Sequence, residues 1–431
     1  MQYAHGIGVN LGQFAHQLLQ VLLVGLTLGM MRTVVPALSE SDFGVPKTSF
    51  LLLASFVMAF GVVKGVMNFV AGRLSEQVGR RRVLIMGWWV VVPVPFMVWY
   101  APNWGWVVAA TLLLGVHQGL TWSMTQTAKL DLTHTHERGL TLGLNEFAGY
   151  VGVAAAGLAT AWLAASGGAR WAVLVFGVAV IGVGLLLSLA AVRETLPWAR
   201  AAAVATPRAR EFSTAETRSD AAAWVMPSTW VVFAQVSWRD RRMFAVCQAA
   251  MVEKFVDALV WVIYPVYLYQ QSLSLPEVGA VISVYGLMWG VCQLVSGPLS
   301  DRVGRHLLNV WGMALCGLGV ALMVCGHGVA WWCGCAALSG LGMALLYPNL
   351  AAAIADMAPP LWRGSAIGIY RLWRDLGYAL GALGLAVSAQ LTQQLESAFW
   401  FVAASMAAST SILWWLGEET HVRPPPAPMA R

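Results

Sequence analysis

Charged side chains lie deep inside several long apolar stretches of this chain. An ionisable group in such a stretch is costly unless it is paired or hydrated, and it therefore marks a pathway for an ion or a solute. The deeply placed residues are Arg32, Lys64, Glu146, Asp257, Arg371, Arg374 and Asp375, with Glu253 and Lys254 beside Asp257. The surplus of Arg and Lys in the first set predicts an anionic or carboxylate-bearing solute, because a guanidinium binds such groups through paired hydrogen bonds.

Helical spacing places these residues on shared faces, since residues three or four apart lie on the same side of a helix. Lys64 shares a face with Asn68, and Arg371 shares one with Arg374 and Asp375. The predicted solute-binding residues are Arg32, Lys64, Asn68, Arg371 and Arg374. A carboxylate near these cations can take up a proton as the solute leaves, and the predicted proton-coupling residues are Glu146, Asp257 and Asp375.

The elements that carry these charges are membrane helices. Of the 431 residues, 58% are hydrophobic and only 11% are charged, whereas a soluble domain has about 25% charged residues. About 20 apolar residues span the hydrocarbon core as a helix. The sequence predicts an all-α membrane protein with twelve spans, at roughly 14–37, 48–71, 83–101, 105–129, 139–165, 171–192, 243–270, 278–298, 307–326, 330–355, 365–391 and 397–417.

Basic residues predict the orientation of these spans, because cytoplasmic loops keep the positive charge. With the N-terminus inside, nineteen Lys and Arg fall in the inner loops and tail, and the outer loops hold Lys47 and Arg170. Both termini are therefore predicted to be cytoplasmic. The net charge of +6 follows from this topology and gives no reason to expect a nucleic-acid partner. Without a basic n-region and a cleavage site before it, the first span is expected to be a retained helix.

An internal repeat divides the chain into two halves. Gly72 matches Gly297, and Arg138 matches Arg363, at a constant offset of 225 residues. The predicted domains are an N-terminal six-helix half (1–192), a cytoplasmic linker (193–242) with a short surface helix near 228–238, a C-terminal six-helix half (243–417) and a cytoplasmic tail (418–431).

The same offset pairs charges of opposite sign in the two halves. It places Arg32 opposite Asp257, and Glu146 opposite Arg371. The alternative to a transport role is that these pairs are permanent ion pairs that hold the halves together.

Each half carries a basic turn after its second predicted span. The first turn reads GRLSEQVGR from Gly72 to Arg80, and the second reads GPLSDRVGR from Gly297 to Arg305. Glycines allow a tight turn, Glu76 can lie at the N-terminus of a neighbouring helix, and the arginines can pair with acidic groups or anionic lipid. This duplicated turn resembles the G-x-L-x-D/E-x-x-G-R motif of the major facilitator superfamily of transporters, and the resemblance extends over the whole chain.

The resemblance implies two pseudo-symmetric six-helix bundles with a solute site at the midplane between them. The first, fourth, seventh and tenth spans would line the cavity, and the second, fifth, eighth and eleventh would form the moving interface. By the same resemblance, conformational gating falls on Gly72, Glu76, Gly79, Arg80, Asp301 and Arg305. The competing interpretation of the two turns is simple positive-inside charge.

The expected function is that of a proton-coupled secondary transporter that moves a small anionic or carboxylate-bearing solute by alternating access. Drug/proton antiporters of the family carry G-x-x-x-G-P-x-x-G-G in the fifth span, whereas this chain has Glu146 and no Gly-Pro pair between Gly143 and Gly152. One alternative is a multidrug or metabolite exporter whose charged residues form a proton relay. A second is a non-transporting membrane sensor or scaffold on the same fold.

Enzyme motifs are missing from the sequence. It contains no nucleotide-binding glycine loop, Ser/His/Asp arrangement or HExxH helix. The chain is therefore not expected to be an enzyme or to hold a cofactor or a metal. Its expected partners are a small solute, protons and the lipid bilayer, and it is expected to act as a monomer in a bacterial inner membrane.

Overall fold

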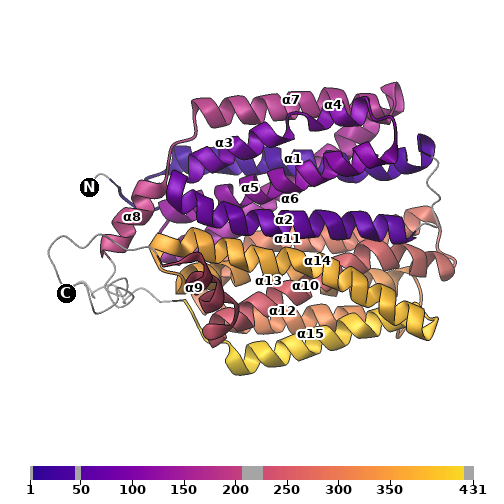
Figure 1. Cartoon of the computed structure of the whole chain (residues 1–431). Helices are drawn as coiled ribbons and strands as arrows, with labels where there is room; N and C mark the ends of the chain where they lie inside the picture. Colours follow the sequence, from indigo (N-terminus) through magenta and orange to yellow (C-terminus); the bar gives the residue numbers. More distant parts are fainter. Residues whose placement is uncertain (1–2, 44–49, 206–226, 422–431) are drawn as a thin grey trace.

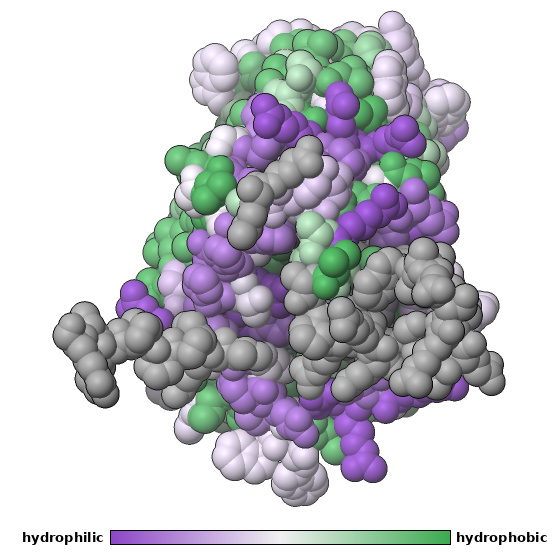
Figure 2. All heavy atoms as spheres, turned by 90° about the vertical axis from the view of Figure 1, so that its left-hand side faces the viewer, coloured by the Kyte–Doolittle hydropathy of each residue, from purple (hydrophilic) through white to green (hydrophobic). Residues whose placement is uncertain are grey.

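The computed structural model describes residues 3–43, 50–205 and 227–421, which form helices and connecting turns and no strand. The long helices run roughly side by side, and two short helices, α8 (Leu196–Ala205) and α9 (Thr229–Ala234), lie at one end of the bundle (Figure 1). We call this the basic end, because it also holds the two basic turns at Gly79 and Gly304. Hydrophilic side chains gather on this face (Figure 2).

The first half closely follows the predicted spans. It comprises α1 (Leu11–Ser41), α2 (Phe50–Val78), α3 (Arg80–Val91), α4 (Val94–Trp99), α5 (Trp104–Leu132), α6 (Arg138–Gly167) and α7 (Ala169–Ala190). The span predicted over 83–101 is confirmed as the candidate membrane span Arg80–Trp99, which has a break between α3 and α4. Pro93 and Pro95 at the break supply no backbone N–H for a continuous helical ladder.

The second half repeats this arrangement. It comprises α10 (Arg241–Gln270), α11 (Leu275–Val303), α12 (His306–Leu322), α13 (Val329–Met357), α14 (Arg363–Thr392) and α15 (Glu396–Leu416). The surface helix predicted near 228–238 is confirmed as α9, which continues into a π-helical turn over Gln235–Arg239. The helix α8, within the predicted linker, was not anticipated.

Eight helical segments of the described residues are long and apolar enough to cross a membrane. The other four predicted spans coincide with α2, α10, α12 and α14. Of these, α12 has only 17 residues, and α10 and α14 carry most of the deeply placed charges. The two helices in which the charges concentrate are therefore among those that depart from an ordinary membrane-spanning composition.

A polar cap fixes the start of α10, the helix that positions three of the central charges. The Asp240 carboxylate accepts hydrogen bonds from the backbone N–H of Arg242 at 2.9 Å and of Met243 at 3.4 Å. Partial burial raises the pKa of this carboxyl, but hydrogen bonds from Arg242 outweigh that effect and hold the pKa below its ordinary value. The ionised cap stabilises the helix N-terminus.

Two helix pairs join the halves, α2 with α14 and α6 with α11. These are the second, eleventh, fifth and eighth predicted spans, so the expected interface is confirmed. At the basic end Gly72 packs on the backbone of Gly364 and Gly368, and Gly139 packs on Gly297, where any Cβ would clash. Glycine is needed at these crossings because the backbones touch.

The two interfaces differ away from the basic end. Gly61 and Gly65 of α2 still lie close to the backbone of α14. A Cβ atom added to Gly61 would lie 3.0 Å from the carbonyl oxygen of Asp375, and one added to Gly65 would lie 3.2 Å from that of Leu372. Their counterparts 225 residues later, Gly286 and Gly290 of α11, have nothing within 4 Å. The halves are therefore closed at the basic end and diverge along the α6 and α11 side towards the opposite end.

Valine at Gly297 is expected to disrupt this closure, because its Cβ would overlap the carbonyl oxygen of Gly139. Overpacking of this kind costs about 1–3 kcal/mol, so the melting temperature of the detergent-purified Gly297→Val protein should fall by several degrees. Gly290→Val on the same helix is the matched control, because its Cβ position is open. Equal melting temperatures for the two variants would contradict the close crossing.

Candidate functional site

The deeply placed charges meet between the two halves. We call the following eight residues the central cluster: Lys64, Glu146, Glu253, Lys254, Asp257, Arg371, Arg374 and Asp375. Each is at most 6% exposed, and they come from α2, α6, α10 and α14. Of the predicted solute-binding and proton-coupling residues, only Asn68 and Arg32 lie outside this set. Asn68 contacts the cluster directly, and Arg32 lies apart from it.

Asp375 joins α14 to α2 inside the cluster. Its Oδ2 atom accepts a hydrogen bond from Asn68 Nδ2 at 2.6 Å, and Lys64 Nζ lies 3.8 Å from the same oxygen. Ser123 of α5 in turn donates through its hydroxyl to Oδ1 of the Asn68 side chain. The predicted shared face of Lys64 and Asn68 is therefore confirmed, and it is directed at the other half.

Asp257 is held by three donors from its own half. Tyr285 donates to Oδ1 at 2.8 Å, and Lys254 and Tyr378 donate to Oδ2 at 2.7 and 3.1 Å. The ion pair considered between Arg32 and Asp257 is wrong, because these donors already satisfy the carboxylate. Arg32 instead stacks over the ring of Trp261, 3.8 Å from its centroid.

Glu146 and Arg371 also do not form the direct pair that the offset suggested. Glu146 Oε1 accepts hydrogen bonds from Trp122 Nε1 at 3.1 Å and Asn145 Nδ2 at 2.9 Å. Arg371 donates through Nη1 to Gln126 Oε1 at 2.8 Å, a contact between α14 and α5. Neutral side chains thus bind both groups in place of a salt bridge.

Arg371 and Arg374 retain unused hydrogen-bond donors although they are buried. The Nε and Nη2 atoms of both guanidinium groups have no hydrogen-bond partner, and the nearest carboxylate to Arg374 is Asp375 at 3.7 Å. The two residues lie three apart on α14, so they share a helix face. Buried donors without acceptors are costly, and an anion between these residues would satisfy them.

Aromatic rings form the walls around these cations. Arg374 and Lys254 lie over the ring of Tyr347, at 4.5 and 4.2 Å from its centroid. The hydroxyl of Tyr347 lies 3.0 Å from that of Tyr150, which joins α13 to α6. Trp289 packs against both tyrosine rings. These contacts cross between the halves and give the cluster an amphipathic lining.

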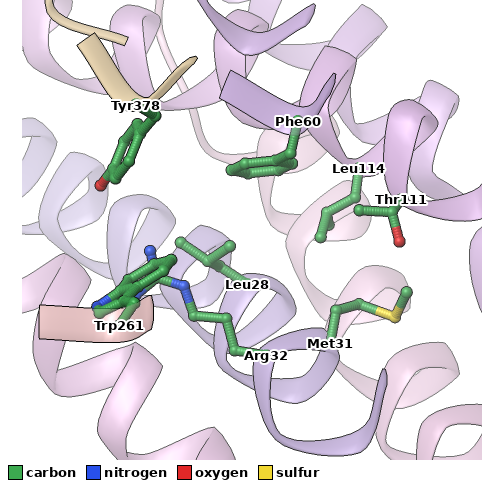
Figure 3. A pocket seen from close by; sticks show the side chains of 8 residues that line it. All are labelled: Leu28, Met31, Arg32, Phe60, Thr111, Leu114, Trp261 and Tyr378. Atoms are coloured by element: carbon green, nitrogen blue, oxygen red, sulfur yellow. The ribbon is translucent and has the colours of Figure 1, made fainter. Parts of the chain in front are cut away.

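A small pocket lies beside the cluster (Figure 3), and its lining residues come from the parts of α1, α2, α5, α10 and α14 that are distant from the basic end. Arg32, with its guanidinium against Trp261, is its one charged lining residue. The lining residues are Leu28, Met31, Arg32, Phe60, Thr111, Leu114, Trp261 and Tyr378. Tyr378 also donates to Asp257, so the pocket reaches the edge of the central cluster.

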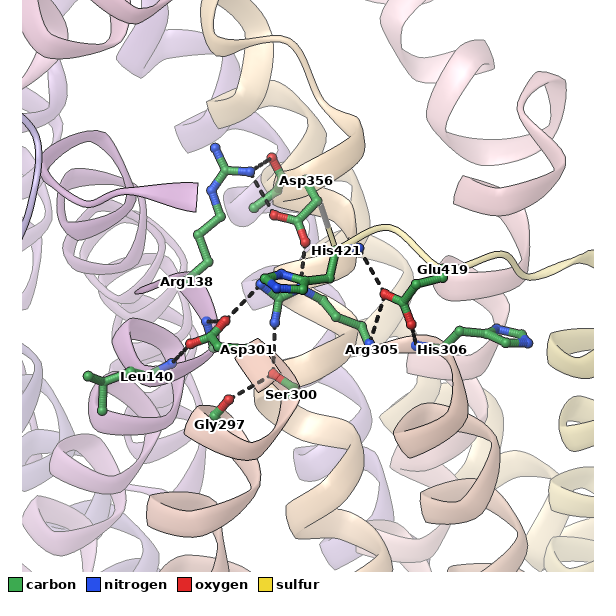
Figure 4. A network of polar contacts seen from close by, with 12 residues as sticks. Arg138, Leu140, Gly297, Ser300, Asp301, Arg305, His306, Asp356, Glu419 and His421 are labelled. Carbon is green, nitrogen blue, oxygen red and sulfur yellow. Dashed lines mark hydrogen bonds and ion pairs between the residues drawn. The ribbon is translucent and has the colours of Figure 1, made fainter. Parts of the chain in front are cut away.

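The carboxylates of the two basic turns cap helices of the opposite half. Glu76 accepts hydrogen bonds from the backbone N–H and the hydroxyl of Ser365, at 2.7 and 2.6 Å, at the start of α14. Asp301 accepts from the backbone N–H of Gly139 and Leu140, both at 2.8 Å, at the start of α6 (Figure 4). A helix N-terminus favours a negative charge, so each half binds a helix end of the other.

Arginines complete this network at the basic end. Arg80 pairs with Asp131 at 2.8 Å within the first half, and Arg305 pairs with Asp356 and with Asp301 within the second. Asp356 also binds Arg138 of the first half at 2.7 Å (Figure 4). We call the following set the latch: Glu76, Arg80, Asp131, Arg138, Asp301, Arg305 and Asp356.

Glu194 and Glu419 are functional candidates that the motif analysis missed. Glu194 accepts backbone N–H bonds from Arg80 and Arg81 at 2.9 and 3.1 Å, and Glu419 accepts from Arg305 and His306 at 2.9 and 3.2 Å. They fix the turns at Gly79 and Gly304, whose φ angles are 98° and 105°. The signal was available, since these glutamates are also 225 residues apart.

Known proteins share this architecture. The human organic anion transporter MFSD10 (TETRAN) superposes with a TM-score of 0.75 at 18% identity, covering 93% of this chain and 98% of that one. The fucose:proton symporter FucP of Escherichia coli gives a TM-score of 0.69 at 11% identity, covering 94% and 98%. At these identities the likeness shows the fold alone.

Sequence relatives match over shorter regions. An uncharacterized MFS-type transporter of Mycobacterium tuberculosis (MT2531) is 29% identical over 146 residues, which is 34% of this chain and 35% of that protein. A probable L-galactonate transporter of Escherichia coli is 32% identical over 109 residues, covering 25% and 24%. The chain therefore spans about a third or less of the length of these relatives.

A sequence profile of the major facilitator superfamily matches residues 18–252 and 244–431. The first match runs from α1 through the predicted linker into α10, and the second begins in α10. The chain accordingly belongs to the major facilitator superfamily.

Proposed function

We propose that this protein is a secondary transporter that carries a small anionic or carboxylate-bearing solute, coupled to protons, by alternating access across a bacterial inner membrane. The observation that carries the proposal is the pair Arg371 and Arg374, whose buried guanidinium groups keep four nitrogen donors without acceptors. A carboxylate or a phosphate accepts paired hydrogen bonds from such groups. Lys64, Asn68 and, at the pocket, Arg32 complete the proposed solute path.

Two of the similar proteins are named for such substrates, one for organic anions and one for L-galactonate, which carries a carboxylate, whereas FucP is named for fucose. The aromatic rings around Tyr347 offer apolar surface to the carbon skeleton of an organic anion. The same ring faces also hold the arginines in place. The multidrug-exporter alternative lacks a comparable feature, since the pocket presents a cation and no free carboxylate among the residues that line it.

The latch and the glycine crossings support gating at the basic end. Glu76 and Asp301 each bind a helix of the other half, and Arg138 binds Asp356 across the same boundary. The pocket lies on the opposite side of the cluster. With twelve spans and the basic end in the cytoplasm, this conformation is outward-facing, and Gly72, Gly79, Arg80 and Arg305 belong to the proposed gate.

Proton coupling would use carboxylates that compete with the solute for these cations. Glu146, Asp257 and Asp375 all lie in the central cluster, and each binds a cation or a neutral donor there. Proton uptake by a cluster carboxylate would release positive charge for the anion, and the proton and the anion would then bind together.

Substitution of the two arginines tests the substrate class. In proteoliposomes, a panel of monocarboxylates, dicarboxylates and organophosphates should include a solute that the wild type takes up. Arg371→Gln and Arg374→Gln should each lower its apparent affinity at least about tenfold, because a hydrogen bond to a charged group contributes roughly 1.5–3 kcal/mol. Arg371→Lys and Arg374→Lys keep the positive charge but lose the paired donors of the guanidinium group. Their apparent affinities should lie between those of the wild type and the glutamine variants.

The control is Arg302→Gln, since Arg302 is exposed at the basic end. It should leave the affinity unchanged. Tetraphenylphosphonium flux that persists in both glutamine variants, without any anion flux by the wild type, would overturn the anion proposal and favour the exporter.

Loss of the Arg138 side chain tests the latch. In a variant with its native cysteines replaced and Thr141→Cys added, the new thiol is buried at the basic end, where Thr141 is fully covered. Arg138→Gln should raise its labelling rate by a membrane-impermeant maleimide at least about fivefold, the change expected for roughly 1 kcal/mol of coupling. Arg302→Gln is again the control, and an unchanged rate in Arg138→Gln would show that the pair does not hold the gate.

A further inference from the structure

Glu253 stands apart from every other carboxylate of the central cluster. It lies near the middle of α10, its side chain is 0% exposed, and neither of its carboxylate oxygens has a hydrogen-bond partner. The nearest cation is Lys254, with Nζ at 3.7 Å. That ammonium group is already bound more closely, at 2.7 Å, by Asp257.

The remaining carboxylates of the cluster all accept hydrogen bonds. Asp257 has three donors, Asp375 has Asn68, and Glu146 has Trp122 and Asn145. Such donors stabilise the ionised form of a buried carboxylate. Without them, an ionised carboxylate in a membrane interior is costly, and a bound proton removes the charge that causes the cost.

We infer that Glu253 is the residue that binds the transported proton. This inference rests on the proposed function and assigns its coupling role to Glu253. It replaces Glu146, Asp257 and Asp375 in that role, because their hydrogen-bond donors favour the ionised form. In this conformation Glu253 carries the proton on a carboxyl oxygen. The proton passes to water when the opposite side of the site opens, and the carboxylate is regenerated for the next cycle.

The charges around Glu253 explain how its proton would be coupled to the solute. Glu253 interacts electrostatically with Lys254 and Asp257 of its own helix. It also interacts with Arg374 of α14 and Glu146 of α6. The other titratable neighbours are Tyr347 of α13, Tyr370 of α14 and Cys316 of α12. An ionised Glu253 offsets the positive charge of Arg374, whereas a protonated Glu253 leaves that charge to the solute.

Proton binding and anion binding would therefore favour each other. Coupling of this kind is reciprocal, so the anion must raise the proton affinity of the site by the same factor as the proton raises the anion affinity. The protein would then move one proton and one anion in the same direction. An antiporter would need the two to bind in competition, and protonation of Glu253 has the opposite effect.

Glu253→Gln tests the assignment, because the amide has the shape of the protonated carboxyl and cannot release a proton. With the anion found in the uptake panel, wild-type proteoliposomes should accumulate solute in response to an inward proton gradient, with an affinity that falls as pH rises. Glu253→Gln should retain anion exchange between the two sides, lose gradient-driven accumulation at least about tenfold, and show an affinity independent of pH.

Glu418→Gln is the matched control, since the Glu418 side chain is 68% exposed. It should keep accumulation and the pH profile of the wild type. A Glu253→Gln protein that still accumulates the anion with the wild-type pH profile would overturn the assignment. If the glutamine variant does not fold, Glu253→Asp is used, which should keep coupling with a displaced pH midpoint, and an unchanged midpoint would equally overturn it.

A readout without solute separates this inference from the proposed function. The melting temperature of the purified wild type should change with pH, and Glu253→Gln should flatten that profile because the exchangeable proton is gone. A flattened profile in a protein that transports none of the anions would leave the proton site intact and contradict the substrate class alone. A profile identical to that of the wild type would contradict the proton site.

Discussion

The cost of placing charge inside a membrane protein governs the rest of this structure. Eight ionisable side chains lie between the halves at no more than 6% exposure, where water cannot screen them. Most are compensated locally, as Asp257 is by Lys254 and two tyrosines. Arg371 and Arg374 are not fully compensated. A site with unpaired hydrogen-bond donors is suited to bind an anion, which supplies acceptors.

One helix links this site to the gate. α14 begins where Glu76 caps Ser365, continues through Gly368 against α2, and then presents Arg371, Arg374 and Asp375 to the cluster. Asp375 binds Asn68 of α2, the same helix that carries Glu76. Occupation of the arginines and closure of the basic end therefore act on one pair of packed helices. Most of the apolar core of each half comes from its own helices, and Leu130 and Leu142 of the first half pack into the core of the second.

Much of this arrangement follows from patterns along the chain. Hydropathy located the helices, and the 225-residue offset related the two halves and their basic turns. The interface helices and the gating role of Glu76 and Asp301 came from the resemblance to the major facilitator superfamily. The offset misled where it was applied to single charges. Arg32 and Asp257 are equivalent by symmetry, yet Asp257 is satisfied by tyrosines from α11 and α14 that no helical spacing connects to it. Glu253 was noticed only as a neighbour of Asp257, because lack of a hydrogen-bond partner is a property of three-dimensional packing.

The central claim is that the buried arginines bind an anion. It is tested most directly by measuring the melting temperature of the purified wild-type protein against carboxylates, phosphates, neutral sugars and organic cations, each titrated at several pH values. The account predicts that stabilisation is confined to anions, saturates with concentration and strengthens as pH falls, since a ligand that binds only the folded state raises its stability. Stabilisation by cations or neutral solutes alone, at every pH, would contradict it.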